Sequence, residues 1–361
     1  MHSLKKFSAK SFSYFIWVIF LVFISCANTD KYIYGIKDKV LVIYIIADNN
    51  LNIQANAFIN SLSDTTIENN CEVIIYIDDN SSPRLYKIKN GLCLIRQYEE
   101  HNSTSPKNIN SILSYIAQRY PAKETGLILW SHGTGWLYTE NSEKCSFGID
   151  KGCTVNISEL ATSLPIFYNY IIFDACYMSS LEVLTELKDN TQYLLASPTI
   201  VPNEGIITKE AIPTLLKNNA IGVRLRKIAD TYINNYALYT DDISITLTTT
   251  SLIDNLIRSI QSEPNINKSN YNFNTIPYYN FRDQKIFFDA VEAFKALNLP
   301  NNLLTNTIKY YRDNSNGNLK HNGVSIFVPH NSNYDYFESY NKTKWNQLTL
   351  WLQKFQPITV R

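Results

Sequence analysis

The stretch Tyr170–Leu187, YIIFDACYMSSLEVLTEL, decides the expected fold. It opens with a short apolar run, as expected for a strand that is buried on both faces. The run ends in Asp174-Ala175-Cys176, and the residues from Leu181 onward have the spacing of a helix. A buried strand followed directly by a helix is the repeating unit of a parallel sheet with helical crossovers. Cys176 is therefore expected at the carboxyl end of a buried strand.

The same alternation runs through the first half of the chain. Further buried strands are predicted at Val40–Ala47, Val73–Ile77, Leu127–Trp130 and Tyr193–Ala196. Helices are predicted at Leu51–Leu62 and Ile109–Tyr120, and a hairpin turns at Asn90-Gly91. This pattern predicts an α/β fold with a mainly parallel sheet flanked by helices. In such sheets, ligands bind beyond the carboxyl ends of the strands.

The second half of the chain has a weaker pattern. We predict a core over residues 27–220 and a C-terminal extension over residues 221–361. The extension is expected to contribute a late strand at 323–329 and a smaller set of helices, including Phe287–Leu297 and Leu303–Tyr311.

Composition excludes several classes of protein. Of the 361 residues, 45% are hydrophobic and 18% are charged, an ordinary globular balance. The net charge of +1 provides no field to recruit nucleic acid or an anionic membrane. No repeat of fixed period is present, which argues against a solenoid or a propeller.

The N-terminus has the features of an export signal. Basic residues up to Lys10 precede an uncharged, mostly apolar run that ends at Ser25, too short for a comfortable membrane span. Cys26 follows a small residue, which resembles a bacterial lipobox. Residues 1–26 are therefore predicted to be a signal peptide, with Cys26 lipidated and the protein anchored in the cell envelope by lipid alone. The alternatives are a short signal anchor and a plain signal peptide in which Cys26 is incidental.

Five other cysteines remain, and their spacing includes no CxxC motif that would indicate a zinc site. Cys71 and Cys93 lie in or beside apolar runs and are predicted to be small buried residues. Cys145 and Cys153 lie in a polar loop and could pair. Cys176 is then the thiol that requires an explanation.

His132 offers an explanation for the Cys176 thiol, because it also follows a predicted buried strand, Leu127–Trp130. A nearby imidazole can hold a thiol as the nucleophilic thiolate. The N–H groups of Gly133 and Cys176 could form an oxyanion hole. No Asn or Asp is identifiable as an orienting third member, so the sequence predicts a dyad. Taken alone, either residue would be ordinary, as a surface histidine or a packed cysteine.

Acidic residues near these motifs have two interpretations. Asp174 is two residues before Cys176, so it is expected to face the same side, where a carboxylate could grip a basic group. Its alternative role is a helix N-cap. The pairs Asp78-Asp79 and Asp241-Asp242 are explained by turns and caps at least as well as by calcium. We therefore expect no metal and no cofactor, with calcium as the open alternative.

Five segments together resemble the clostripain family of cysteine peptidases, whose fold is caspase-like. They are ADNNL (47–51), LILWSHGTGW (127–136), FDACYMSSLEVLTEL (173–187), ASPTIVPNEG (196–205) and GVSIFVP (323–329). The resemblance implies an endopeptidase with His132 as base and Cys176 as nucleophile, acting on protein or peptide substrates with Arg or Lys before the cut bond. It matches Asp174 to the carboxylate that holds that basic side chain, and Glu204 to a second acidic position of the pocket loop.

Other features leave the function open at particular points. Met178-Ser179-Ser180 and Pro198-Thr199 depart from the family pattern and put substrate choice in doubt. The alternative functions are a catalytically silent binding lipoprotein, and an amidase or transpeptidase with the same residue pair. The polar interval between His132 and Cys176 predicts self-cleavage, after Lys144 first and after Lys151 second.

Overall fold

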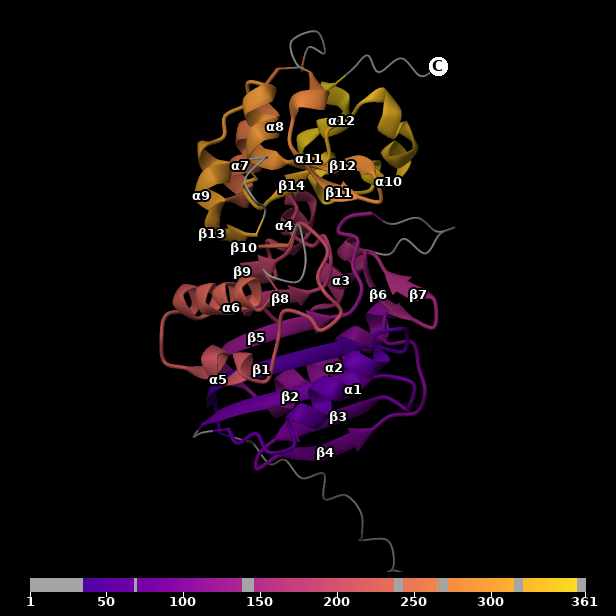
Figure 1. The fold of residues 1–361 in the computed structure, drawn as a ribbon, viewed down its shortest axis with the longest axis vertical. Helices are drawn as coiled ribbons and strands as arrows, with labels where there is room; N and C mark the ends of the chain where they lie inside the picture. Colours follow the sequence, from indigo (N-terminus) through magenta and orange to yellow (C-terminus); the bar gives the residue numbers. More distant parts are fainter. Residues whose placement is uncertain are drawn as a thin grey trace, which may run out of the picture. The chain divides into compact units, whose positions relative to one another are not determined.

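The computed structural model describes residues 35–67, 70–137, 146–236, 243–264, 266, 272–314 and 321–355. Residues Ile36–Arg361 group into one compact unit, to which everything below refers (Figure 1). Within the described ranges, no helix is both long enough and apolar enough to cross a membrane. Cys26, Lys144, Cys145 and Asp241-Asp242 lie outside the described residues.

A nine-stranded sheet organises the unit, with the strand order β13-β10-β9-β8-β5-β1-β2-β3-β4. In that order the strands are Ile308–Asp313, Ser244–Thr249, Thr191–Ala196, Tyr168–Asp174, Ala122–Trp130, Lys37–Ile46, Cys71–Asp78, Arg84–Ile88 and Leu92–Gln97. The five central strands, β9 to β2, pair in parallel, and the flanking strands pair antiparallel. The predicted α/β fold with a mainly parallel sheet is confirmed.

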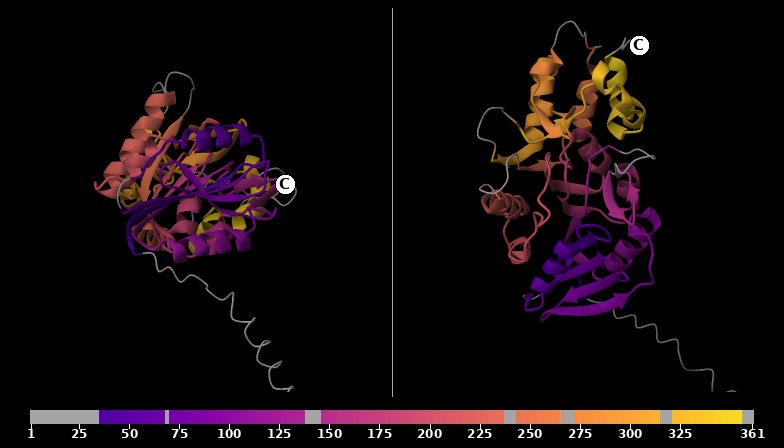
Figure 2. Two further views of the ribbon diagram at one scale, coloured as in Figure 1. Left: turned by 90° about the horizontal axis from the view of Figure 1, so that it is seen from below. Right: turned by 45° about the vertical axis from the view of Figure 1, so that its right-hand side comes forward.

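Helices cover both faces of this sheet (Figure 2). Side chains alternate along β1: Val42 and Tyr44 join one hydrophobic cluster, and Leu41 and Ile43 join the other. The first cluster includes α2 (Pro106–Arg119), α3 (Ile157–Ser163), α4 (Leu181–Leu187) and α7 (Ile253–Ser262). The second includes α1 (Asn52–Ser61), α5 (Ala211–Leu216) and α6 (Ile221–Tyr236). Asn156 caps α3 by accepting from the N–H of Glu159.

A second, three-stranded sheet lies in the later part of the chain. It has the order β11 (Tyr278–Phe281), β12 (Gln284–Asp289) and β14 (Ser325–Ile326). Figure 1 shows it beside α8 (Ala290–Ala296), α10 (Phe337–Asn341), α11 (Lys344–Thr349) and α12 (Trp351–Lys354). The N–H of Ser325 donates to the carbonyl of Ser179 at 3.0 Å, which joins this sheet to the segment just after Cys176.

Three expectations for the second half need correction. The predicted helix Phe287–Leu297 is strand β12 followed by α8, with Asp289 as the N-cap between them. The predicted helix Leu303–Tyr311 is α9 (Asn302–Thr307) followed by strand β13. The late strand predicted at 323–329 is only the two residues of β14, and it pairs with β12. Short runs of β-branched and aromatic residues become strands when a sheet edge is available to pair with them.

Cys93 is a fourth correction. It lies on β4, the edge strand of the large sheet, and it is exposed rather than buried. Cys71 is partly buried, at the start of β2. The apolar run around Cys93 is an antiparallel edge strand, and such a strand can leave one face to solvent.

Candidate active site

His132 and Cys176 leave the same edge of the large sheet. Strands β5 and β8 are parallel neighbours, with Trp130 in register with Asp174. Each candidate residue lies two positions beyond its member of that pair. Both residues therefore stand beyond the carboxyl ends of neighbouring strands, where ligands bind in sheets of this kind.

Two glycines allow the loop after β5 to lie directly on the loop after β8. A Cβ atom at Gly133 would lie 2.7 Å from the carbonyl oxygen of Cys176. A Cβ atom at Gly135, where φ is +65°, would lie 2.6 Å from the carbonyl oxygen of Tyr177. Only residues without a side chain fit at these two contacts. The glycines therefore fix how close His132 comes to the Cys176 backbone.

The hairpin of β6 (Phe147–Asp150) and β7 (Cys153–Val155) holds the His132 loop from its other side. The N–H of Gly148 donates to the carbonyl of His132 at 2.9 Å, and the N–H of Thr134 donates to Ser146 at 3.1 Å. Gly133, between them, is the non-hydrogen-bonded position of this bridge. Within the described residues, the N–H of Gly133 has no protein acceptor, and the N–H of Cys176 interacts only with its own thiol. Both remain available for an oxyanion.

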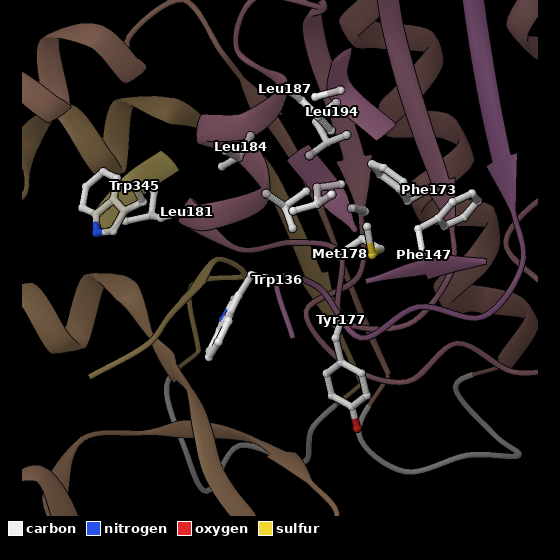
Figure 3. Close-up of a cluster of buried hydrophobic side chains, with 14 of the residues drawn as sticks. Trp136, Phe147, Phe173, Tyr177, Met178, Leu181, Leu184, Leu187, Leu194 and Trp345 are labelled. Carbon is white, nitrogen blue, oxygen red and sulfur yellow. The ribbon is translucent and has the colours of Figure 1, made fainter. Parts of the chain in front are cut away.

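A sharp turn after Cys176 depends on Tyr177, whose φ of +59° is unusual for a residue with a side chain. Its N–H donates to the carbonyl of Thr199 at 2.9 Å, and its hydroxyl donates to the carbonyl of Asn280 at 2.8 Å. Its ring stacks on Phe287, with the centroids 5.2 Å apart. Figure 3 shows the ring directed away from Met178, the next residue. Strained backbone of this kind persists only where the surroundings enforce it.

The thiol of Cys176 is partly buried, and it contacts the loop after β9. The N–H of Val201 donates to Sγ at 3.2 Å, and the thiol lies 3.8 Å from the Val201 carbonyl. Burial raises the pKa of the Cys176 thiol, and burial lowers the pKa of His132. Both shifts favour the neutral thiol and the neutral imidazole over the ion pair.

Asn50 is a site residue that the sequence analysis did not identify. Its Oδ1 lies 2.7 Å from Nε2 of His132. The turn after β1 carries it there, because Asn49 donates from Nδ2 to the carbonyl of Ile149 at 2.6 Å and accepts from the N–H of Leu51. The sequence predicts a dyad because no third residue is identifiable in it, and the structure places Asn50 in contact with the histidine. The ADNNL segment contained the signal, but nothing in the sequence placed it beside His132.

A cavity of about 540 Å³ connects these groups. Its lining includes Asn50, His132, Gly133, Cys176, Ile200 and Arg282. A second cavity, of about 470 Å³, adjoins it and shares Tyr177, Ile200 and Arg282 with the first. Neither cavity is lined by Asp174 or Glu204.

Asp174 is instead covered by the loop after β9, with only 2% of its surface exposed. Its two carboxylate oxygens accept from the N–H groups of Ile206 and Ile207 at 2.7 and 2.9 Å. Burial raises the pKa of Asp174 to about 7, partly offset by these hydrogen bonds. No cation among the described residues pairs with it. Glu204, two residues before Ile206, is exposed.

Lys151 lies in the turn between β6 and β7, with φ +45°. Its Nζ pairs with Glu100 at 2.8 Å and with Asp48 at 3.1 Å. The carboxylates of Asp48, Glu100 and Asp150 lie within 4.8 Å of one another, so Lys151 balances part of their charge.

Asp79, considered above for calcium, pairs with Arg84 at 2.5 Å.

Comparison with known proteins agrees with this architecture. The family model described as the clostripain family, Peptidase_C11, matches residues 43–356. No curated protein sequence matches the chain significantly.

Three solved structures share the fold. A secreted C11 cysteine protease from Bacteroides thetaiotaomicron, bound to an irreversible peptide inhibitor, has a TM-score of 0.75 at 22% identity, over 88% of this chain and 99% of that one. The structure called iotapain, from the same organism, has a TM-score of 0.73 at 23% identity, over 87% and 99%. An inactive zymogen C11 protease from Parabacteroides distasonis has a TM-score of 0.73 at 21% identity, over 87% and 98%.

A mainly parallel α/β sheet, with a histidine and a cysteine at neighbouring strand ends beside one cavity, is the architecture of a caspase-like cysteine peptidase. The family match covers most of the chain, and the protein belongs to the clostripain family.

Proposed function

We propose that this protein is a cysteine endopeptidase in which Cys176 attacks the peptide bond and His132 is the base. One observation carries the proposal. The two residues leave adjacent parallel strands and line the same cavity of about 540 Å³, together with Gly133, whose N–H has no acceptor among the described residues. A nucleophile, a base and an oxyanion donor around one space are the requirements of acyl transfer.

In the proposed reaction, His132 takes the proton of the Cys176 thiol as Sγ attacks the carbonyl carbon of the substrate. The negative charge that develops on the carbonyl oxygen is stabilised by the N–H groups of Gly133 and Cys176. Collapse of this intermediate breaks the C–N bond, and His132 returns the proton to the leaving amine. Water then hydrolyses the thioester, with His132 again as base, and releases the carboxylic acid and the thiol.

Asn50 completes the arrangement in this proposal. If Nε2 of His132 donates to Oδ1 of Asn50, the proton on that nitrogen is fixed and Nδ1 is left as the basic atom. Asn50 then positions the imidazole without touching the substrate.

The test is digestion of a peptide library by the full-length chain. The wild type should cut peptides, and Cys176→Ala and His132→Ala should not, while circular dichroism shows all three folded. More than a tenth of the wild-type activity in Cys176→Ala would remove Cys176 as the nucleophile. Cys176-dependent release of ammonia from side-chain amides, with no peptide bond cut, would instead indicate an amidase. No turnover of either kind would indicate a silent binding protein.

Within this function, the bond that is cut follows Arg or Lys. The support is Asp174, a buried carboxylate without a cationic partner among the described residues, two positions before Cys176. The hydroxyl of Tyr232 is also buried and has no hydrogen-bond partner among the described residues. A basic side chain would supply the missing charge for the first group and a donor for the second. Glu204 is exposed in the same loop, and its carboxylate would assist in binding the basic side chain.

For Asp174 to reach a substrate, the loop at Gly205–Ile207 must move from the arrangement described. Gly205, at φ +83°, allows this loop to pack directly on Asp174, since a Cβ there would lie 2.7 Å from Asp174 Oδ2. The proposal therefore includes a loop shift on binding of the substrate, with the two N–H bonds to Asp174 exchanged for the cation.

Maturation and location complete the proposal. The enzyme is cut by itself after Lys144, in the interval between Leu137 and Ser146. It is exported and held at a bacterial membrane by lipid on Cys26. Cys26→Ser should then appear in the soluble fraction after cell fractionation, whereas a variant that stays membrane-bound with an uncleaved N-terminus would indicate a signal anchor.

A further inference from the structure

We propose that Arg282 selects substrates with an acidic side chain, Asp or Glu, within a few residues of the cut bond. Arg282 lines both the cavity at Cys176 and the second cavity beside it. The inference concerns a position other than the one before the cut, and it rests on the proposed peptidase function.

The charge of the cavity is the first observation. Among the described residues that line the cavity at Cys176, Arg282 has the only formal charge when His132 is neutral. The lowered pKa of His132 favours the neutral imidazole. The carboxylates of Asp283 and Asp313 line only the second cavity. Among the described residues, Arg282 is therefore the one cationic group that lines the Cys176 cavity, and a substrate carboxylate is the matching group.

The guanidinium group is also available. Within the described part of the chain, Arg282 is exposed and has no ion pair or side-chain hydrogen bond. Its guanidinium carbon lies 5.6 Å from the centre of the Phe281 ring, and Phe281 lines the same cavity. Stacking on an aromatic ring directs the planar group without using its five N–H donors. These donors match a carboxylate in a bidentate arrangement.

The backbone places Arg282 there at a cost. It forms, with Asp283, the two-residue turn between β11 and β12, and their φ values are +51° and +61°. Such turns favour Asn-Gly, because both central residues need positive φ. Aspartate tolerates such a φ, but an arginine in this position gives no advantage to the hairpin itself. Retained strain next to a catalytic cavity is a sign of function.

The turn is fixed relative to the nucleophile. The N–H of Asp283 donates to Asn280 Oδ1 at 3.0 Å, and the hydroxyl of Tyr177 donates to the carbonyl of Asn280 at 2.8 Å. The Tyr177 ring also meets the Phe281 ring edge-on, with the centroids 5.1 Å apart. Because Tyr177 directly follows Cys176, the position of Arg282 is set by the same residue that turns the chain at the nucleophile. A group held in this way can act as a specificity determinant.

The experiment measures binding and so does not depend on turnover. Fluorescent peptides are titrated against full-length Cys176→Ala by anisotropy. At each position around the scissile bond, Glu is compared with Gln. At one position other than the residue before the cut, we expect the Glu peptide to bind about 3- to 10-fold more tightly, a range suited to an exposed, partly screened contact. Added salt should reduce the preference.

Adding Arg282→Gln should abolish this preference, and adding Arg282→Glu should reverse it in favour of Lys. The matched control is Arg258→Gln, an equal loss of charge on α7 at an exposed residue that lines neither cavity; it should leave the preference intact. Equal binding of Glu and Gln peptides at every position, no binding of any peptide, or a preference that survives Arg282→Gln would overturn the inference. Failure of the wild type to cut any peptide would count against the proposed peptidase activity, and the binding titration would still decide the role of Arg282.

Discussion

The thiol of Cys176 is held by the backbone of Val201, whose N–H donates to Sγ at 3.2 Å. The sulfur of Cys176 thus accepts a hydrogen bond from the loop after β9. No hydrogen bond joins Sγ to His132 in the described structure. Burial raises the pKa of the thiol and lowers the pKa of the imidazole, and both shifts favour a neutral pair in the resting site. Formation of the thiolate then belongs to the substrate-bound state.

Alkylation of Cys176 by iodoacetamide tests this resting state. Its rate should rise with pH through a single step above the ordinary thiol value of about 8.5, because only the thiolate reacts. The measurement is mass spectrometry of the Cys176 peptide from the full-length chain, with the exposed thiol of Cys93 as the internal reference. A reactive plateau that extends down to pH 6 would show a preformed thiolate–imidazolium pair.

Asn50→Ala should lower kcat by about 100-fold while KM changes little, because a misplaced base costs about this much. The readout that separates positioning from folding is the pH profile of kcat. Loss of the Asn50 contact frees both nitrogens of His132 and should shift the acidic limb. Asn50→Gln, which keeps the amide, should recover part of the rate. An unchanged rate and profile in Asn50→Ala would assign the contact at 2.7 Å to packing alone.

Asp174→Asn should reduce kcat/KM for Arg and Lys peptides by about 30- to 1000-fold, as for a buried charge left without its partner. Since the carboxyl has a pKa of about 7, wild-type kcat/KM for these peptides should rise as the pH passes 7, and the variant should lack this step. Glu204→Gln is the companion variant, with a smaller effect because Glu204 is exposed. Undiminished basic preference in Asp174→Asn would move the pocket to Glu204.

Titration of Asp174 also changes the free energy of unfolding, and the sign of the change follows from its raised pKa. The pKa of Asp174 is raised above its ordinary value of about 3.9, so the folded state keeps a proton that the unfolded state has lost. Its contribution to the free energy of unfolding therefore falls as the pH rises from about 4 to about 7. Urea denaturation at both pH values should show a larger fall in the wild type than in Asp174→Asn, because other buried carboxyls with raised pKa, such as Glu182, contribute equally to both proteins.

Gly133→Ala should destabilise the fold by about 1–3 kcal/mol and abolish activity, because its Cβ would lie 2.7 Å from the Cys176 carbonyl oxygen. Gly222→Ala is the control, since a Cβ there meets no atom within 4 Å and the residue lies in helix α6. That variant should be as stable as the wild type or slightly more so. Equal stability of the two variants would mean that the two loops are not packed as described.

Self-cleavage should occur after Lys144 and not after Lys151. Lys151 lies in a tight turn between two paired strands, and its side chain pairs with Asp48 and Glu100. Extending it into another active site would break the hairpin. Lys144→Ala should therefore give a single uncut band on a denaturing gel, as should Cys176→Ala, whereas Lys151→Ala should be cut like the wild type. Cutting that persists in purified Cys176→Ala would assign the cut to another protease.

The local sequence was sufficient to predict the two strands that precede His132 and Cys176. Apolar runs of four to eight residues, each followed by a helical pattern, specify a parallel sheet, because only that arrangement buries both faces of every strand. His132 and Cys176 follow two such runs, so their common edge could be predicted before the structure. The second half was predicted less well. The segments after Phe287 and Leu303 each contain both a strand and a helix, and short apolar runs do not distinguish the two.

The sequence by itself determined the α/β class, the positions of His132 and Cys176 at strand ends, and the need for glycine beside them, because these depend on periodicity and on backbone freedom within short segments. Tertiary structure alone decided that Asn50 contacts His132, that the β9 loop covers Asp174, and that Arg282 reaches the cavity at Cys176. Their separations along the chain are large, and a contact between distant segments follows from how the elements pack. No local pattern records that packing, which is why these three relationships could not be derived from the sequence.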